Sequence, residues 1–509
     1  MKRRISYLLI ACLMILSLAS CTRDPKPPVD PAAPGKPLDG GEITVAMYSD
    51  LDSSLDPHES GNSAATREIM FNIYEGLVKI DSEGNIIPAL AESYSQSESS
   101  DEYTFKIRPG VKFHDGRQLE MADVISSLRR AAGLDSGVAL VAAFSAVKEV
   151  EQIGDDSVKI TLNAPDTEFL PRATAAIFPR DIDPVTQVCG TGPFKLTSRV
   201  VQDNIVLEKN EDYWGTPAYL DKVVLKVYED GEALVMSLRS GASDMAMRLG
   251  ASQIAELDSL NIIEGSNNLV QALYLNNAVK PFDDARVRQA LSYAIDKQEV
   301  INLASDGYGT PIGSSMYPAF GKYFMPELTD YYTRDVDKAK ALLKEAGYPN
   351  GFEFSIAVPS NMPPHIDTAQ VLVEMFKEIG VSAKIELVEW ATWLDEVYTQ
   401  RKYQSTIVGV DARDATASDL LSRFVSTAAD NFTNFNSAEF DKVYAEAKAS
   451  SNDKEQTELF KDCQRVLTEE AAAVYIQDLA SFVVMKKGLE GYLFYPLYIT
   501  DFAAIYRTE

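Results

Sequence analysis

The sequence predicts an α/β fold, and three observations lead to this prediction. Short runs with a hydrophobic residue at every second position indicate β-strands. Longer runs with hydrophobic residues at helical spacing indicate amphipathic helices. In the C-terminal half, residues 335–360 and 367–390 each read as a helix that ends at a glycine, Gly347 or Gly380, and then a strand. Consecutive helix–strand units are typical of an α/β sheet.

Three further segments illustrate the pattern. GEITVAMYS (41–49) and KVVLKVYED (222–230) each place three hydrophobic residues on one face, as a half-buried strand does. DDARVRQALSYAIDK (283–297) has its apolar residues at helical spacing, which predicts a helix. Asp283 or Asp284 can cap this helix, because a carboxylate accepts hydrogen bonds from the free N–H groups of the first turn.

Two stretches predict tight backbone geometry. YTFKIRPGVKFHDG (103–116) alternates as a strand and then reaches a Pro-Gly turn and a second turn at His-Asp-Gly. GTGPF (190–194) combines two glycines, which allow another segment to approach closely, with a proline that fixes φ. We expect most of these residues to shape the fold and not to contact a ligand.

The N-terminal residues predict export. Three basic residues precede the apolar run of residues 5–20, which is too short for a comfortable membrane span and is typical of a secretory signal. Residues 18–21, Leu-Ala-Ser-Cys, resemble a bacterial lipobox, which implies cleavage after residue 20 and a lipid on Cys21. The alternative is an ordinary signal peptide in which the cysteine is incidental.

Residues 21–40 are predicted to be a tether. They contain six prolines between Pro25 and Pro37, and proline favours extended polyproline II and disfavours helix and sheet. With a lipid on Cys21, this segment would hold the folded part near the outer face of a bacterial membrane. The expected location is therefore the cell membrane, lipid-anchored, on its extracytoplasmic face.

Length and net charge limit the possible architectures and functions. A chain of 509 residues exceeds what one core supports, so we expect two or three lobes. The net charge of −27 argues against nucleic-acid binding, which needs clustered Lys and Arg. Such acidity could favour a cationic ligand, but solubility is the ordinary explanation for it.

Catalytic and metal-binding motifs are absent from the sequence. It contains no G-x-S-x-G, H-E-x-x-H, P-loop or C-x-x-C pattern. The histidines, His58, His114 and His365, are not at metal-ligand spacing, so we expect no metal site, no cofactor and no enzymatic activity. Cys189 and Cys463 could pair in an exported protein, or could remain two separate buried thiols.

Eight stretches, in this order and spacing, resemble the large solute-binding proteins of bacterial ABC importers, which include oligopeptide-, dipeptide- and nickel-binding members. The resemblance runs from about residue 41 to the end. The stretches are SLDPH (54–58), NIYEGLVKID (72–81), IIPALAESY (86–94), residues 103–130, CGTGPFKL (189–196), LEKNEDYWG (207–215), residues 280–300 and DKAKALLKEAGYPNGF (337–352).

This resemblance implies a type II, periplasmic-binding-protein-like clamp of the large cluster C kind, in which two α/β lobes enclose the ligand. Lobe I would comprise residues 41–272 and 484–509, with an extra subdomain at about 80–185. Lobe II would comprise residues 273–483. Closure about a hinge would tell the permease whether the receptor is loaded.

The resemblance also implies a peptide ligand and candidate contacts. In peptide-binding members a lobe II carboxylate pairs with the peptide ammonium group, in a motif of Trp followed by D-x-x-D-P. Asp411 and Asp414 match its two aspartates, although Val410 and Ala415 stand where Trp and Pro are usual. Both aspartates could instead cap the following helix. The other candidate ligand contacts are Trp390, Tyr48, Ser49, Ser54 and Arg67.

The function expected from the resemblance is a monomeric receptor that delivers peptides to the transmembrane subunits of an ABC permease. One alternative is the same fold binding nickel, another metal chelate or an oligosaccharide. Another is a secreted enzyme or an adhesin on this scaffold.

Overall fold

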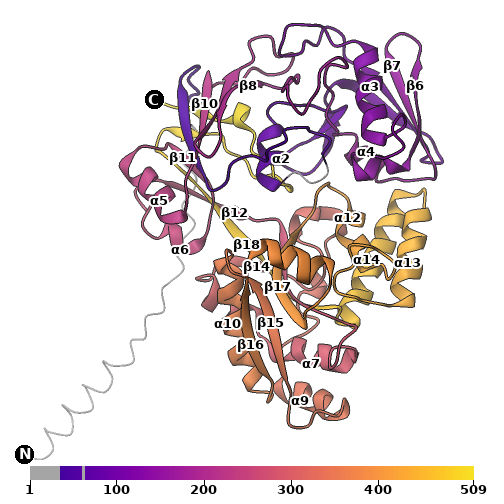
Figure 1. The fold of residues 1–509 in the computed structure, drawn as a ribbon, viewed down its shortest axis with the longest axis vertical. Coiled ribbons are helices and arrows are strands. Elements are labelled where there is room, and N and C mark those ends of the chain that lie inside the picture. Colours follow the sequence, from indigo (N-terminus) through magenta and orange to yellow (C-terminus); the bar gives the residue numbers. More distant parts are fainter. Residues whose placement is uncertain (1–34, 60–62) are drawn as a thin grey trace, which may run out of the picture. The chain divides into compact units, whose positions relative to one another are not determined.

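One twelve-stranded β-sheet runs through most of the protein, with β16 at one edge and β8 at the other (Figure 1). The computed structural model describes residues 35–59 and 63–509, of which 37–509 belong to one compact unit. The predicted signal peptide, the lipidation of Cys21 and most of the predicted tether lie outside the described residues. Within the described ranges, no helix has both the length and the hydrophobicity needed to cross a bilayer.

Ten strands of this sheet form a continuous path, in the order β16-β15-β17-β13-β18-β11-β1-β10-β9-β8, and β12 and β14 also pair with β18. The bounds are β1 Glu42–Met47, β8 Phe194–Val200, β9 Asn204–Lys209, β10 Lys222–Val227, β11 Met245–Leu249, β12 Asn261–Ser266, β13 Leu269–Leu275, β14 Gly309–Pro311, β15 Glu353–Pro359, β16 Ser382–Val388, β17 Ser405–Asp411 and β18 Ala473–Met485.

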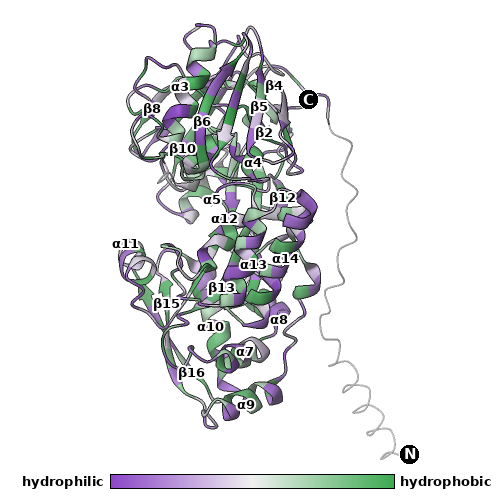
Figure 2. Ribbon diagram, turned by 90° about the vertical axis from the view of Figure 1, so that its right-hand side faces the viewer, coloured by the Kyte–Doolittle hydropathy of each residue, from purple (hydrophilic) through white to green (hydrophobic). Residues whose placement is uncertain are grey.

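The long strand β18 belongs to both lobes. Its first residues pair with β13, for example Ala473 with Tyr274, whereas its last residue, Met485, pairs with β11 and β12. In Figures 1 and 2 the strands β8 and β10 lie in the upper lobe, and β15 and β16 lie in the lower lobe. The predicted lobe boundaries, 272/273 and 483/484, fall inside β13 and β18, and they stay predictions.

A four-stranded antiparallel sheet, in the order β4-β5-β7-β6, forms a subdomain of the upper lobe together with helix α3. Its core has its own buried cluster, which includes Tyr103, Phe105, Leu128 and Phe144. The elements of this region are β2 Val78–Ile80, β3 Ile86–Pro88, β4 Ala91–Gln96, β5 Glu102–Ile107, α3 Met121–Ala132, β6 Val147–Ile153, β7 Ser157–Leu162 and α4 Phe169–Arg172.

Separate hydrophobic clusters pack on the two faces of the lower-lobe sheet. One cluster contains Leu291, Ile356 and Phe376, and the other contains Tyr274, Phe424 and Phe460. The remaining α-helices are α2 Ala64–Met70, α5 Gly231–Ser240, α6 Ala251–Ile254, α7 Ala285–Ala294, α8 Lys297–Ala304, α9 Val336–Glu345, α10 Pro363–Lys377, α11 Trp390–Thr392, α12 Ala417–Leu421, α13 Ala438–Ala449 and α14 Asp453–Glu469.

Shorter elements complete the chain. They are the 3-10 helices Ala142–Ala146, Pro318–Tyr323, Pro326–Leu328, Ser422–Phe424 and Phe502–Ala504, the π-helix Trp393–Thr399, and the paired strands β19 Leu489–Glu490 and β20 Tyr506–Arg507.

The predicted elements are confirmed with small shifts. The helix–strand units appear as α9 with β15 and α10 with β16, and the two strands are parallel neighbours. The predicted helix of residues 283–297 is shorter, because α7 ends at Ala294 and α8 starts at Lys297 with its own cap, Asp296. Asp284 caps α7 by accepting a hydrogen bond from the N–H of Arg286 at 2.9 Å.

The close backbone approach predicted at GTGPF is also confirmed. The N–H of Gly192 donates to the carbonyl oxygen of Ile73 at 2.9 Å, and the N–H of Phe194 donates to that of Asn72 at 3.0 Å. A Cβ atom on Gly190 would lie 2.0 Å from the carbonyl oxygen of Ile73. This contact holds residues 72–73 in place, directly before Tyr74 in the site described next.

Candidate ligand-binding cleft

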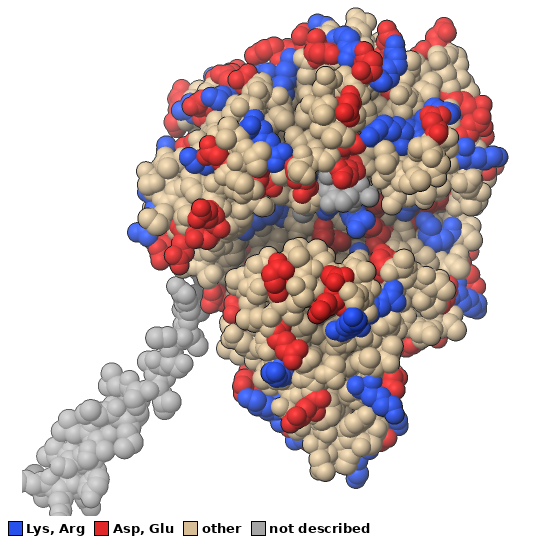
Figure 3. Space-filling model, viewed as in Figure 1, with Lys and Arg blue, Asp and Glu red and all other residues tan. Residues whose placement is uncertain are grey.

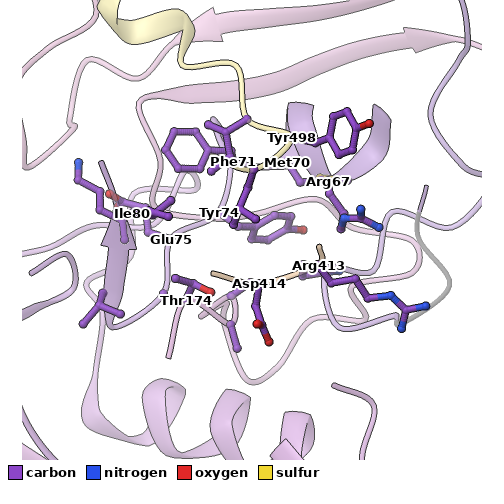
Figure 4. A pocket seen from close by; sticks show the side chains of 18 of the residues that line it. Arg67, Met70, Phe71, Tyr74, Glu75, Ile80, Thr174, Arg413, Asp414 and Tyr498 are labelled. Atoms are coloured by element: carbon purple, nitrogen blue, oxygen red, sulfur yellow. The ribbon is translucent and has the colours of Figure 1, made fainter. Parts of the chain in front are cut away.

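A cavity of about 630 Å³ lies between the two lobes, and we call it the first cavity (Figure 4). The upper lobe supplies most of its wall, through α2, β2, the end of α4 and residues 497–504. The lower lobe contributes the loop that follows β17, residues 412–414, and Asp419 of α12. Figure 3 shows the hollow between the lobes, with acidic and basic side chains at its edges.

Aromatic side chains form much of the wall of the first cavity. Phe71, Tyr74 and Tyr498 line it, and Figure 4 shows them on the same side of the cavity as Arg67. The guanidinium of Arg248 lies 3.8 Å from the ring centroid of Tyr498, and this cation–π contact fixes the ring. Apolar walls with a few charged groups are typical of sites that bind small molecules.

An ion pair joins the two lobes at the edge of the first cavity. Nη2 of Arg67, on α2, lies 3.1 Å from Oδ2 of Asp411, at the end of β17. Arg67 lines the cavity, whereas Asp411 is not among the lining residues. The structure therefore brings two predicted site residues together, one from each lobe.

Asp414 forms a second ion pair across the cleft. Nε of Arg172, in α4, lies 3.4 Å from its Oδ2, and the N–H of Thr416 donates to its Oδ1 at 3.1 Å. Burial, together with the charge of Asp419, raises the pKa of Asp414 to about 6, although the charge of Arg172 acts in the opposite direction. Asp414 lines the first cavity, and its contact with a ligand stays a prediction.

The other predicted contacts lie elsewhere. Trp390 stacks on Trp393, with ring centroids 5.1 Å apart and planes at 4°. Trp393 is buried, and its indole N–H donates to Oγ1 of Thr406 at 2.9 Å. Neither indole is among the lining residues of the first cavity. In this structure Trp390 covers a core residue of the lower lobe.

Tyr48, Ser49 and Ser54 follow β1 and are likewise not among the lining residues. The Tyr48 hydroxyl accepts a hydrogen bond from the side chain of Gln253, in helix α6. Ser54 accepts only a long hydrogen bond, 3.4 Å, from the N–H of Asp56. Their predicted role in binding therefore receives no geometric support from the first cavity.

Several lining residues were not predicted, notably Arg172, Arg413, Tyr74 and Tyr498. They come from four distant parts of the chain, and no local pattern connects them. The nearest signal is Arg413 itself, which stands between the two aspartates of the matched motif. Its exposed side chain places a positive charge at the cavity.

The histidines and the thiols have structural environments. Burial lowers the pKa of His58, His114 and His365 to about 4. Both ring nitrogens of His114 and of His365 are hydrogen-bonded within the fold, and Nε2 of His58 bonds to the carbonyl oxygen of Ala176. Cys189 and Cys463 are separate buried thiols. Among residues 35–59 and 63–509, no group of three or more His, Cys, Asp or Glu side chains could hold a metal ion.

Comparison with known proteins assigns the family. The model of bacterial extracellular solute-binding proteins, family 5 Middle, matches residues 85–432, which is more than half of the chain. The chain belongs to this family. It is thus a solute-binding protein of the ABC-importer type, with the two-lobed type II fold.

The sequences of individual relatives align with this chain over most of their length. This solute-binding protein is 28% identical to the glutathione-binding protein GsiB of Salmonella typhimurium, over 89% of this chain and 92% of that one. It is 28% identical to the dipeptide-binding protein of Escherichia coli, over 81% and 84%. The structure of DppA from Helicobacter pylori in complex with the peptide STSA superimposes with a TM-score of 0.76 at 27% identity, over 93% and 99%.

Proposed function

We propose that this protein is a lipid-anchored, monomeric receptor that encloses a short peptide between its lobes and delivers it to an ABC permease. The observation that carries the proposal is the first cavity, whose two walls are joined by ion pairs from opposite lobes. Such an arrangement suits capture by hinge closure. The names of the relatives, which specify glutathione, a dipeptide and a tetrapeptide, support a peptide ligand.

Native mass spectrometry of the full chain, purified from cells without added ligand, tests this proposal. We expect an adduct with the mass of a short peptide, and fragmentation of the released adduct should yield amino acids. An adduct that fragments as a sugar, or that carries a metal isotope pattern, would show that the ligand is an oligosaccharide or a metal complex and not a peptide.

The peptide ammonium group is proposed to bind a carboxylate of the loop that follows β17. We expect N-acetylation of an equimolar tripeptide mixture to weaken its retention by about 10- to 100-fold, because a hydrogen bond between charged groups is lost. Asp411→Asn should cause a similar loss for free tripeptides and little further loss for acetylated ones. Equilibrium dialysis with mass-spectrometric quantification measures all four combinations.

Two further variants are needed to interpret the result with Asp411→Asn. Asp414→Asn tests whether the neighbouring aspartate carries the role instead of Asp411. Asp462→Asn serves as the control, because this aspartate lies half-exposed on α14, where it pairs with Arg465. Equal retention of free and acetylated tripeptides by the unmodified protein would rule out ammonium recognition, while leaving peptide binding itself intact.

Membrane attachment is proposed to depend on Cys21, which lies outside the described residues. We expect Cys21→Ser to abolish incorporation of radiolabelled fatty acid and to move the protein from the membrane fraction to the soluble fraction. The physical reason is that the lipid chains supply the binding energy, since a single 14-carbon chain already binds only marginally (about 10⁴ M⁻¹). Full membrane retention of the variant would contradict lipid anchoring.

A further inference from the structure

A second cavity, of about 720 Å³, lies next to the first one. Leu497 lines both cavities, and chain neighbours divide between them: Arg172 and Asp414 face the first, while Pro171 and Ala415 face the second. Each volume is within the usual range for a small-molecule site. The two cavities are therefore adjacent compartments of the space between the lobes.

A cluster of polar contacts, which we call the cross-cleft contact, lies where the linings of the two cavities meet. It consists of Asp166, Glu168 and Arg172 from the upper lobe and Asp414, Ser418 and Lys448 from the lower lobe. Some of its members line the first cavity and others, such as Glu168, line the second.

Arg172 is the centre of the cross-cleft contact. Its Nη1 lies 2.6 Å from Oδ2 of Asp166 within the upper lobe. Its Nη2 donates to Oγ of Ser418 at 2.9 Å, and its Nε reaches Asp414 in the lower lobe. Because Asp166 belongs to the same lobe, Arg172 keeps one close partner when the lobes separate.

Lys448, on α13, closes the contact from the lower lobe. Its Nζ lies 3.2 Å from Oδ2 of Asp166 and 3.8 Å from Oε2 of Glu168. The N–H of Ser418 also donates to Oε1 of Glu168, at 3.2 Å. Lys448 and Ser418 thus give the upper-lobe carboxylates partners in the lower lobe, in addition to the pairing of Asp166 with Arg172.

The charges of the cross-cleft contact are nearly balanced and largely removed from water. Asp166 and Glu168 are buried, and three carboxylates face two cations. Burial raises the pKa of Asp166, but the charges of Arg172 and Lys448 lower it below its usual value, so it is ionised at neutral pH. Removing one cation would leave buried carboxylates without a partner, which is strongly unfavourable.

We propose that the cross-cleft contact limits the length of the bound ligand to what the first cavity holds. A ligand that extends into the second cavity must break the contact, whereas a short one fits beside it with the contact intact. The first cavity is the ligand compartment because it contains the wall of Phe71, Tyr74 and Tyr498 and, besides Arg172, the arginines Arg67 and Arg413. This inference rests on the proposed peptide-binding function.

Lys448→Ala is the variant that opens the contact, because without this cation the buried carboxylates favour separation of the lobes, which returns them to water. Lys448 is partly exposed on the surface of α13, and its removal leaves three carboxylates with one guanidinium. Lys448→Arg keeps the charge and should behave as the unmodified protein. Lys442→Ala is the matched control, because Lys442 lies on the same helix and is exposed. Ser418→Ala provides an independent weakening of the contact.

The experiment presents equimolar tripeptide and nonapeptide mixtures to each variant and measures retention by native mass spectrometry. We expect the unmodified protein, Lys448→Arg and Lys442→Ala to retain tripeptides and to exclude nonapeptides. Lys448→Ala should retain nonapeptides at least about tenfold more, and Ser418→Ala should shift in the same direction. Circular dichroism confirms that each variant is folded.

The outcomes separate this inference from the proposed function. If the unmodified protein retains nonapeptides as well as tripeptides, or if Lys448→Ala leaves the length profile unchanged, the length limit is overturned and peptide binding stands. If neither mixture is retained by any folded variant, the peptide ligand itself is overturned.

Discussion

Asp478→Asn is expected to raise the free energy of unfolding at pH 8 by up to about 4 kcal/mol and to flatten its dependence on pH between about pH 4 and 7. Asp478 lies in β18, where this strand passes from one lobe to the other, and it is 1% exposed. Its Oδ1 accepts a hydrogen bond from the N–H of Leu269 at 3.0 Å, and Ser266 donates to its Oδ2. Burial raises the pKa of Asp478 to about 7, which these hydrogen bonds offset only in part.

The sign of the pH effect follows from this raised pKa. Below pH 4 the carboxyl group of Asp478 is protonated in the folded and the unfolded state, so its titration does not favour either. Between pH 4 and 7 only the folded state holds the proton, so stability falls as pH rises. Above pH 7 the folded state no longer holds this proton, so the loss of stability is complete and does not grow further with pH. Asparagine does not titrate, and its side-chain oxygen can still accept from Leu269.

Denaturant titrations of the unmodified protein and of Asp478→Asn at pH 4.5 and pH 8 measure how the free energy of unfolding depends on pH. Asp462→Asn, at a half-exposed position, is the control. A stability difference between the two pH values that is the same in the unmodified protein and in Asp478→Asn would contradict the assignment. Ligand affinity at pH 8 provides a second readout, because Asp478 bonds to both residues that flank the link between β12 and β13.

Gly190→Ala is expected to destabilise the protein by about 3 kcal/mol or more and to abolish ligand binding. The added Cβ atom would lie 2.0 Å from the carbonyl oxygen of Ile73, and a backbone atom cannot move aside as a flexible side chain can. Displacing residues 72–73 also affects Asn72, whose side chain donates to Thr500 at 2.8 Å and accepts from Phe502 at 2.9 Å. Both contacts hold the segment of residues 497–504 that lines the first cavity.

Gly250→Ala is the matched control for this prediction. Gly250 has a φ of −87°, and the nearest atom to an added Cβ is 3.8 Å away, so alanine fits without strain. Thermal unfolding of both variants and calorimetric titration with the tripeptide mixture distinguish them. A Gly190→Ala protein with unchanged melting temperature would show that the approach of the two segments tolerates a methyl group.

The sequence predicts the parts of this fold that local pattern determines. Helices α9 and α10 and strands β15 and β16 are correct to within a few residues, because their hydrophobic periodicity and the glycines that end the helices are local signals. The close packing at Gly190 was also predictable, since only glycine allows such an approach.

The candidate site was predictable only in part, because it depends on contacts between distant residues. The matched motif pointed to the loop after β17, where Asp414 lines the first cavity, and its role in binding stays a prediction. However, Arg67 and Asp411 are 344 positions apart, and no periodicity shows that they pair. Similarly, the spacing of Trp390 and Trp393 could not show that the two rings stack on each other and do not line the first cavity.

The sharing of β18 by both lobes has a consequence for how the chain acquires its structure as it is made and exported. Strand β13 pairs with β18 along one edge, and β11 and β12 pair with the opposite end of the same strand. Since β18 spans Ala473–Met485, neither lobe can complete its hydrogen-bonded sheet until nearly the whole chain has emerged. The two lobes must therefore mature together and late, and a ribosome or a translocation channel would hold both of them incomplete until that strand is released.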